Sequence, residues 1–170
     1  RQDSPRVRMA ATERSPSLPD WPDAAALRAA VGTDLPPTRW ETVTPETVRR
    51  FARLTGDDQP LHRAGGTAAG GALVQGALLT ALAAGLLGEV YVLPWARAVY
   101  QAGYDSIRFR TPVRAGAAVR LCARPVQVRA LGNGRLWLAT SVTLECAHEP
   151  EPGMTGRFLS IIEEDRGDAG

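Results

Sequence analysis

The chain has 170 residues, enough for one domain with a hydrophobic core and too few for two ordinary domains. Its hydrophobic fraction of 44% and charged fraction of 22% are ordinary for a soluble globular protein and indicate neither wholesale disorder nor a membrane protein. A net charge of +2 is too small for a nucleic-acid footprint but tolerates an acidic partner or a phosphorylated carrier, and the absence of lysine excludes Schiff-base, lysine-base and phosphate-loop lysine chemistry.

The start of the chain predicts a tail. Residues 1–20 are rich in Arg, Ser and Pro and show no apolar periodicity, so we expect a disordered segment or a cloning remnant here, ahead of one folded domain over residues 21–166. No apolar run follows the early arginines, so the segment does not resemble a secretory signal. We therefore expect a cytoplasmic protein.

Two helices are predicted in the first third of the chain. A short one spans residues 23–31 and stops at Gly32. A second helix begins after Thr44, whose hydroxyl can cap the free amides, and has Pro45 at its first position. Its apolar positions share one face, and it ends near Gly56.

Residues 72–88 form the most apolar run of the chain. Only Gln75 and Thr80 are polar in it, a pattern typical of a helix that is buried on every side. The longest apolar stretch within it, from Gly76 to Gly88, is shorter than a membrane span. We therefore expect a buried helix at the centre of the domain.

The rest of the chain predicts an antiparallel sheet. Period-two alternation indicates strands over residues 99–110, 118–129, 135–146 and 156–164. Gly132-Asn133-Gly134 is typical of a tight hairpin turn, and Pro125 indicates a bulge or an edge position. Cys122 and Cys146 lack metal-ligand spacing, so we expect reduced core thiols and no zinc site. The fold class is α+β, a sheet curled around one apolar helix.

The segment at residues 54–62 carries the candidate chemistry. Asp57 and His62 are five residues apart in a loop whose backbone is restricted by Gly56 and Pro60. An ionised carboxylate can accept a hydrogen bond from water, and an imidazole can give or take a proton at neutral pH, which suits hydration of a conjugated double bond. Alternatively, Asp57 and Asp58 only terminate the helix and the turn, and His62 satisfies a backbone group. The spacing alone leaves both interpretations open.

Three segments, in order, resemble a known family. They read T-G-D-D-Q-P-L-H at 55–62, A-L-V-Q-G-A-L-L at 72–79 and I-R-F-R-T-P-V-R-A-G at 107–116. Together they resemble the MaoC-like, or R-specific enoyl-CoA hydratase, family of hot-dog proteins. The resemblance implies a single hot-dog domain that hydrates or dehydrates an acyl thioester, bound to CoA or to an acyl-carrier protein. It implies neither a metal nor an organic cofactor.

The resemblance also assigns roles to residues. Asp57 and His62 become the catalytic acid/base pair, and the backbone amide of Gly76 polarises the thioester carbonyl. A free amide at a helix N-terminus suits an oxygen that gains negative charge. Close packing of a buried helix would equally explain Gly76.

Gln59, Pro60 and Gln75 are expected to support the pocket. Gln59 stands where the family usually has Asn, and Gln75 stands where it usually has His. Gln75 can form hydrogen bonds but cannot titrate, so a proton relay through this position is lost. The loop between His62 and Gln75 is also shorter than is usual in the family, which leaves substrate preference open.

Two other functions stay open. A hot-dog thioesterase usually carries its carboxylate on or near the central helix, which here has no acidic residue before Glu89. A non-catalytic acyl-binding subunit is the other alternative. In each case we expect a homodimer, because a single hot-dog sheet exposes edge strands. We expect no nucleic-acid or membrane partner.

Overall fold

A computed structural model describes residues 18–66 and 71–165. The tail expected over residues 1–20 lies almost entirely outside these described residues. In chain order the elements are α1 (Ala24–Ala29), β1 (Glu41–Thr42), α2 (Pro45–Thr55), the 3-10 helix η1 (Pro60–His62), α3 (Gly76–Leu87), β2 (Ala96–Phe109), β3 (Ala118–Gly132), β4 (Arg135–Cys146) and β5 (Met154–Glu164). The helices and strands expected from the sequence are confirmed, with small shifts at their ends. Within the described ranges, no helix combines the length and apolarity needed to cross a membrane.

The strands form one antiparallel sheet in the order β1-β3-β4-β5-β2. Gly132 pairs with Arg135, and the two residues between them, Asn133 and Gly134, have φ angles of 51° and 67°. Two central residues with positive φ make the type I′ turn expected for this hairpin. Pro125 lies at a register shift in β3, as the expected bulge requires.

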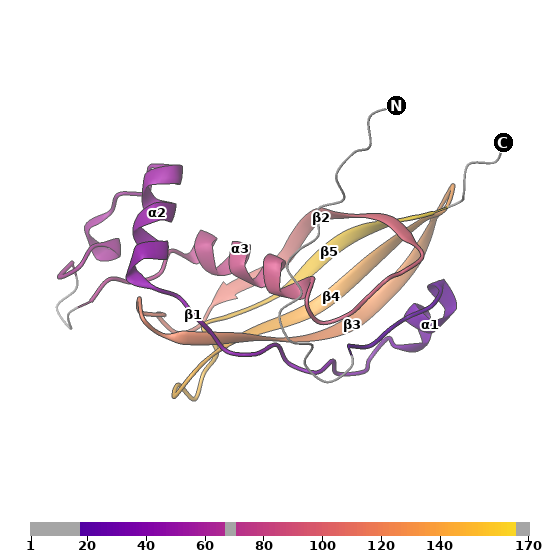
Figure 1. Cartoon of the computed structure of the whole chain (residues 1–170), viewed down its shortest axis with the longest axis horizontal. Coiled ribbons are helices and arrows are strands. Elements are labelled where there is room, and N and C mark those ends of the chain that lie inside the picture. The colour runs from indigo at the N-terminus through magenta and orange to yellow at the C-terminus, as the bar shows by residue number, and fades with distance from the viewer. Residues whose placement is uncertain (1–17, 67–70, 166–170) are drawn as a thin grey trace, which may run out of the picture.

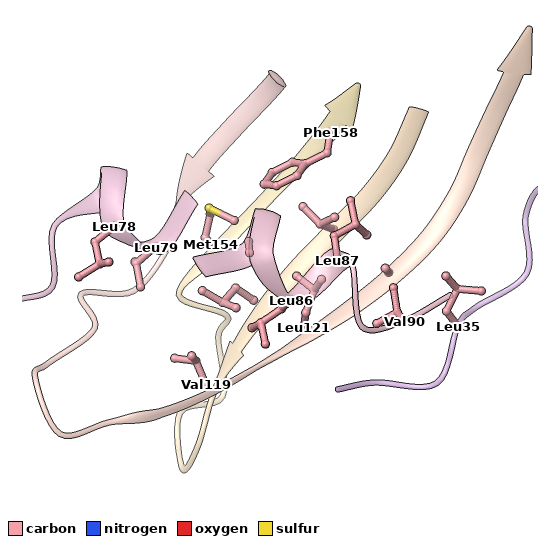
Figure 2. Packing of buried hydrophobic residues seen from close by; sticks show 14 of the residues in the cluster. Leu35, Leu78, Leu79, Leu86, Leu87, Val90, Val119, Leu121, Met154 and Phe158 are labelled. Carbon is pink, nitrogen blue, oxygen red and sulfur yellow. The ribbon is translucent and has the colours of Figure 1, made fainter. Parts of the chain in front are cut away.

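The sheet curls around α3, which lies against its inner face (Figure 1). Figure 2 shows the contact from close by, with Leu78, Leu79, Leu86 and Leu87 of the helix among Val119, Leu121, Met154 and Phe158 of the strands. Burying each leucine side chain contributes about 1.5–3 kcal/mol. This arrangement of one apolar helix in a curled antiparallel sheet is the α+β hot-dog fold.

The opposite side of α3 differs from the sequence-based expectation of burial on all sides. Ala77, Ala81 and Gly85 recur at four-residue spacing, and all three are exposed in the single chain. The sheet covers only one face of the helix, so small apolar residues on the other face remain accessible.

Helix α2 stands near the N-terminal end of α3, away from the body of the sheet (Figure 1). The hydroxyl of Thr44 accepts a hydrogen bond from the Thr47 amide at 3.1 Å, and Gly56 ends the helix with a φ of 74°. Val48 is its buried anchor. Capping at both ends fixes the length of α2 and therefore the point at which the chain enters the following loop.

Candidate active site

The structure brings Asp57 and His62 together. The chain leaves α2 through the left-handed Gly56 and becomes helical again at Pro60. The segment from Asp57 to His62 therefore turns back, which brings its two ends together. Asp57 Oδ2 lies 3.5 Å from His62 Nε2. The His62 side chain is 9% exposed and that of Asp57 is 32% exposed, so the pair is sheltered but open to solvent on one side.

The orientation of the His62 ring is set by the backbone. Its Nδ1 lies 2.8 Å from the carbonyl oxygen of Leu73, which can only accept a hydrogen bond. Nδ1 therefore carries a proton and donates it to this carbonyl. The other ring nitrogen, Nε2, is left facing Asp57 as the atom that exchanges protons. A single water molecule within reach of both groups would contact Asp57 Oδ2 and His62 Nε2 together.

Gln59 supports the carboxylate from its other side. Its Nε2 donates to Asp57 Oδ1 at 3.3 Å, and the Asp57 amide donates to Thr55 Oγ1 at 3.4 Å. The first contact holds Oδ1 and the second holds the backbone, while Oδ2 faces His62. Pro60 acts on the backbone, as the first residue of η1.

Asp58 is placed differently from its neighbour. It pairs with Arg63, whose Nε donates to Asp58 Oδ1 at 2.8 Å and whose Nη2 donates to the Asp58 carbonyl oxygen at 3.0 Å. Its side chain is 70% exposed. Asp58 is thus a surface carboxylate that is already engaged by a cation.

The three segments that carry the family resemblance meet around this loop. Three backbone hydrogen bonds of 2.8 Å join them, from the amides of Leu73, Val74 and Ala115 to the carbonyls of Leu61, Val113 and Ala72. The stretch before α3 is therefore held between the dyad loop and the stretch after β2. Segments far apart in the sequence thus share one site.

Gly76 and Gln75 lie at the start of α3. Gly76 is its first residue, where helix geometry leaves amides without intrahelical acceptors. A Cβ added to Gly76 would lie 2.6 Å from ring carbons of Phe109, so close packing also requires glycine. Gln75 is 1% exposed and donates from Nε2 to the Val48 carbonyl at 3.3 Å, while its buried Oε1 has no partner among the described residues. Gln75 therefore ties α3 to α2.

A cleft of about 660 Å³ opens beside His62. One wall is α2, and the opposite wall is the dyad loop, which contributes Asp58, His62 and Arg63. Asp57, Gln75 and Gly76 are not among the residues that line the cleft. Sequence reasoning missed the role of α2 as a wall, although Arg49, Arg53 and Gly56 recur at intervals of four and three residues and so share a helical face. No group of three or more metal-ligating side chains occurs in the described parts of the chain.

Comparisons with known proteins identify the family of this chain. Residues 27–143 match the family model of the MaoC like domain. The 3-hydroxyacyl-thioester dehydratase Z of Mycobacterium tuberculosis H37Rv is 33% identical over 139 residues, which cover 79% of this chain and 92% of that protein. Nodulation protein N of Rhizobium leguminosarum bv. viciae is 30% identical over 154 residues, which cover 85% of this chain and 93% of that protein.

A solved structure gives the same result at the level of the fold. The (R)-hydratase from A. caviae involved in PHA biosynthesis superimposes with a TM-score of 0.59 at 26% identity, covering 76% of this chain and 94% of that one. Since the family match spans well over half of the chain, the protein belongs to the MaoC-like family.

Proposed function

We propose that the protein adds water to, or removes it from, an acyl chain held as a thioester, and that Asp57 and His62 are its acid/base pair. The observation that carries this proposal is the 3.5 Å approach of Asp57 Oδ2 to His62 Nε2, with His62 lining a cleft. Relatives named as a dehydratase of 3-hydroxyacyl thioesters and as an (R)-hydratase support the reaction class.

The geometry suggests a division of labour in the hydration direction. Asp57 takes a proton from the water whose oxygen bonds to the β-carbon, and protonated His62 delivers its Nε2 proton to the α-carbon. Asp57 then passes its proton to His62 Nε2 across the short gap between them. This restores the starting protonation of both groups, and the net reaction is the addition of one water molecule. The Leu73 carbonyl keeps the imidazole aligned throughout.

The developing negative charge on the thioester oxygen needs a donor. The Gly76 amide at the positive end of the α3 dipole is our candidate for it. Gln59 supports Asp57, and Gln75 fixes the start of α3 against α2. A thioesterase mechanism is less well supported, because α3 carries no carboxylate between Gly76 and Leu87.

We further propose a homodimer. β2 is an edge strand, and four of its large apolar side chains are exposed, namely Val99, Tyr100, Tyr104 and Phe109. Phe109 also packs against Gly76, so this exposed surface adjoins the start of α3 and its uncovered stripe. A second copy that covers both would place the active site near the subunit boundary. Cys122 and Cys146 are both free thiols, which suits the reducing cytoplasm in which we propose that the protein works.

A panel of enoyl thioesters tests the reaction. Enoyl-CoA, enoyl-carrier-protein and enoyl-N-acetylcysteamine substrates would be followed by loss of enoyl absorbance and, in the same sample, by release of free thiol. We expect loss of the enoyl group without thiol release in the wild type and very little loss with Asp57→Asn. Thiol release in step with substrate loss would favour a thioesterase, and a folded protein inert on every substrate would favour a binding subunit.

A further inference from the structure

The cleft beside His62 is lined by more positive charge than the acid/base pair requires. Three arginines border it, Arg49 and Arg53 from α2 and Arg63 from the dyad loop, against one carboxylate, that of Asp58. Arg49 and Arg53 are four residues apart and therefore lie one above the other on the helix. The cleft wall is thus a basic helical face that looks toward the catalytic loop.

Two of these cations already have acidic partners. Arg49 pairs with Glu46, and the guanidinium groups of Arg49 and Arg50 lower the pKa of that carboxyl. Arg63 pairs with Asp58. Arg53, in contrast, has no carboxylate within 4.0 Å in residues 18–66 and 71–165. Of the three arginines that line the cleft, Arg53 is therefore the one whose charge is available to bind an anionic ligand.

The position of Arg53 in the last turn of α2 offers a purely structural explanation, since a cation there interacts favourably with the helix dipole. That explanation accounts for the charge but not for its place on the wall of a cleft shared with His62. A guanidinium presents a planar fork that matches phosphate oxygens in pairs, and low-dielectric walls strengthen the attraction.

We propose that Arg53 binds a phosphate group of the carrier that holds the acyl thioester, and that it therefore helps to determine which thioesters the enzyme accepts. This inference rests on the proposed function, because the reacting carbons must lie beside His62. CoA and the prosthetic group of a carrier protein both attach the acyl sulfur to a phosphate-bearing pantetheine arm. A cleft of about 660 Å³ has room for part of such an arm in addition to a short acyl group.

The chain provides a matched control. Arg28 lies in the last turn of α1, is exposed like Arg53, and has no acidic partner within 4.0 Å among the described residues. Helix α1 is at the opposite end of the molecule from α2 (Figure 1). Arg28→Gln therefore removes the same charge from the same kind of helix terminus without touching the cleft.

The main experiment compares kcat/KM for crotonyl-CoA with kcat/KM for crotonyl-N-acetylcysteamine, which lacks phosphate. In Arg53→Gln we expect the ratio of the two to fall about tenfold, through KM of the CoA substrate, and in Arg28→Gln we expect the wild-type ratio. Arg53→Lys, which keeps the charge but loses the fork, should give an intermediate ratio. High ionic strength should lower the ratio in the wild type more than in Arg53→Gln. An unchanged ratio in Arg53→Gln, or an equal fall in Arg28→Gln, would overturn the proposal.

A third substrate identifies the phosphate. Crotonyl-4′-phosphopantetheine carries only the phosphate that both kinds of carrier share. If it is as sensitive to Arg53→Gln as the CoA thioester, the contact is to the pantetheine phosphate. If only the CoA thioester is sensitive, the contact is to a phosphate of the nucleotide. Either result supports a phosphate site, whereas insensitivity of both contradicts it.

A binding measurement separates this proposal from the proposed reaction. Free CoA should raise the Tm of the wild type and of Arg28→Gln, pantetheine should raise it less, and Arg53→Gln should lose most of the CoA effect. If no thioester is hydrated, the reaction fails while this pattern still supports the phosphate site. If CoA leaves Tm unchanged, or shifts Arg53→Gln as much as the wild type, the phosphate site fails whatever the turnover.

Discussion

Asp57 and Asp58 are adjacent residues with the same functional group and different surroundings. Asp57 faces His62, and Asp58 is exposed and paired with Arg63. We expect Asp57→Asn or His62→Ala to lower the rate by about two to four orders of magnitude, the usual scale of general acid–base catalysis. The double variant should be little worse than either single one, because groups that act as a unit are strongly non-additive.

Asp58→Asn is the matched control, since it removes the same charge from the adjacent residue and breaks a largely exposed ion pair with Arg63. Steady-state kinetics on folded protein would check all four variants. The assignment fails if Asp58 proves essential while Asp57 is dispensable.

Ionisation of Tyr91 is expected to lower the free energy of unfolding at alkaline pH. Its ring stacks on Trp21, and desolvation raises the pKa of the Tyr91 hydroxyl to about 12 from 10.0. A group whose folded-state pKa is raised contributes stability that is complete below pH 10 and is lost as the pH rises through 12, here at most about 3 kcal/mol. Tyr91→Phe removes the ionisable group. We therefore expect denaturant unfolding between pH 9.5 and pH 12 to show a smaller loss for Tyr91→Phe than for the wild type, and equal losses would contradict this.

At the scale of elements, Gly76 tests how α3 meets β2. A methyl group at position 76 would lie 2.6 Å from the Phe109 ring, so Gly76→Ala must displace this ring or the start of the helix. We expect Gly76→Ala to lower kcat/KM about tenfold or more, and Gly76→Ala combined with Phe109→Leu to regain most of the loss, because the backbone amide is still present. If the double variant folds and stays as slow as Gly76→Ala, the methyl group itself obstructs the substrate.

Elements with local signals could be predicted from the sequence. The cap at Thr44, the left-handed Gly56 and the Asn133-Gly134 turn depend on residues within a few positions of one another, and each occurs as expected. The alternation of apolar and polar residues predicted the facing of side chains poorly where a register shift interrupts a strand. Ser106 has a φ of 59° beside a register shift in β2, and Phe109 at the end of this strand is 52% exposed.

The candidate site was only partly predictable, because some of its contacts join residues that are far apart in the sequence. The resemblance singled out Asp57 and His62, and the structure places them in contact. The acceptor for His62 Nδ1 is eleven residues away, and the acceptor for Gln75 Nε2 is twenty-seven residues away. Neither partner has a sequence signal, because both depend on how separate elements pack. The basic wall of the cleft was missed because the sequence shows which residues share a face of α2 but not which part of the chain lies opposite that face.

At the scale of the whole molecule, the exposed edge of β2 predicts the oligomeric state. Val99 is 48% exposed on this edge, and a charge there is a common way to prevent strands from pairing. We expect the wild type to sediment as a dimer at micromolar concentration and Val99→Arg to shift it toward the monomer with reduced turnover. Leu54→Arg is the control, because Leu54 is 83% exposed on α2, away from the edge. A wild-type monomer would contradict the assembly.

The strand order also determines when the fold can close. β2 is made before β3 and β4, yet it pairs with β5, the last strand in the chain. Helix α3, which is uncharged and strongly apolar, likewise packs on strands that all follow it in the chain. Pairings between such distant segments slow folding, because the intervening chain must first be ordered. During synthesis, α3 and β2 therefore emerge without their partners, and a nascent chain of this length is exposed to aggregation until β5 has left the ribosome. In pulse-labelled hydrogen exchange, the β3–β4 hairpin should become protected before β2 does.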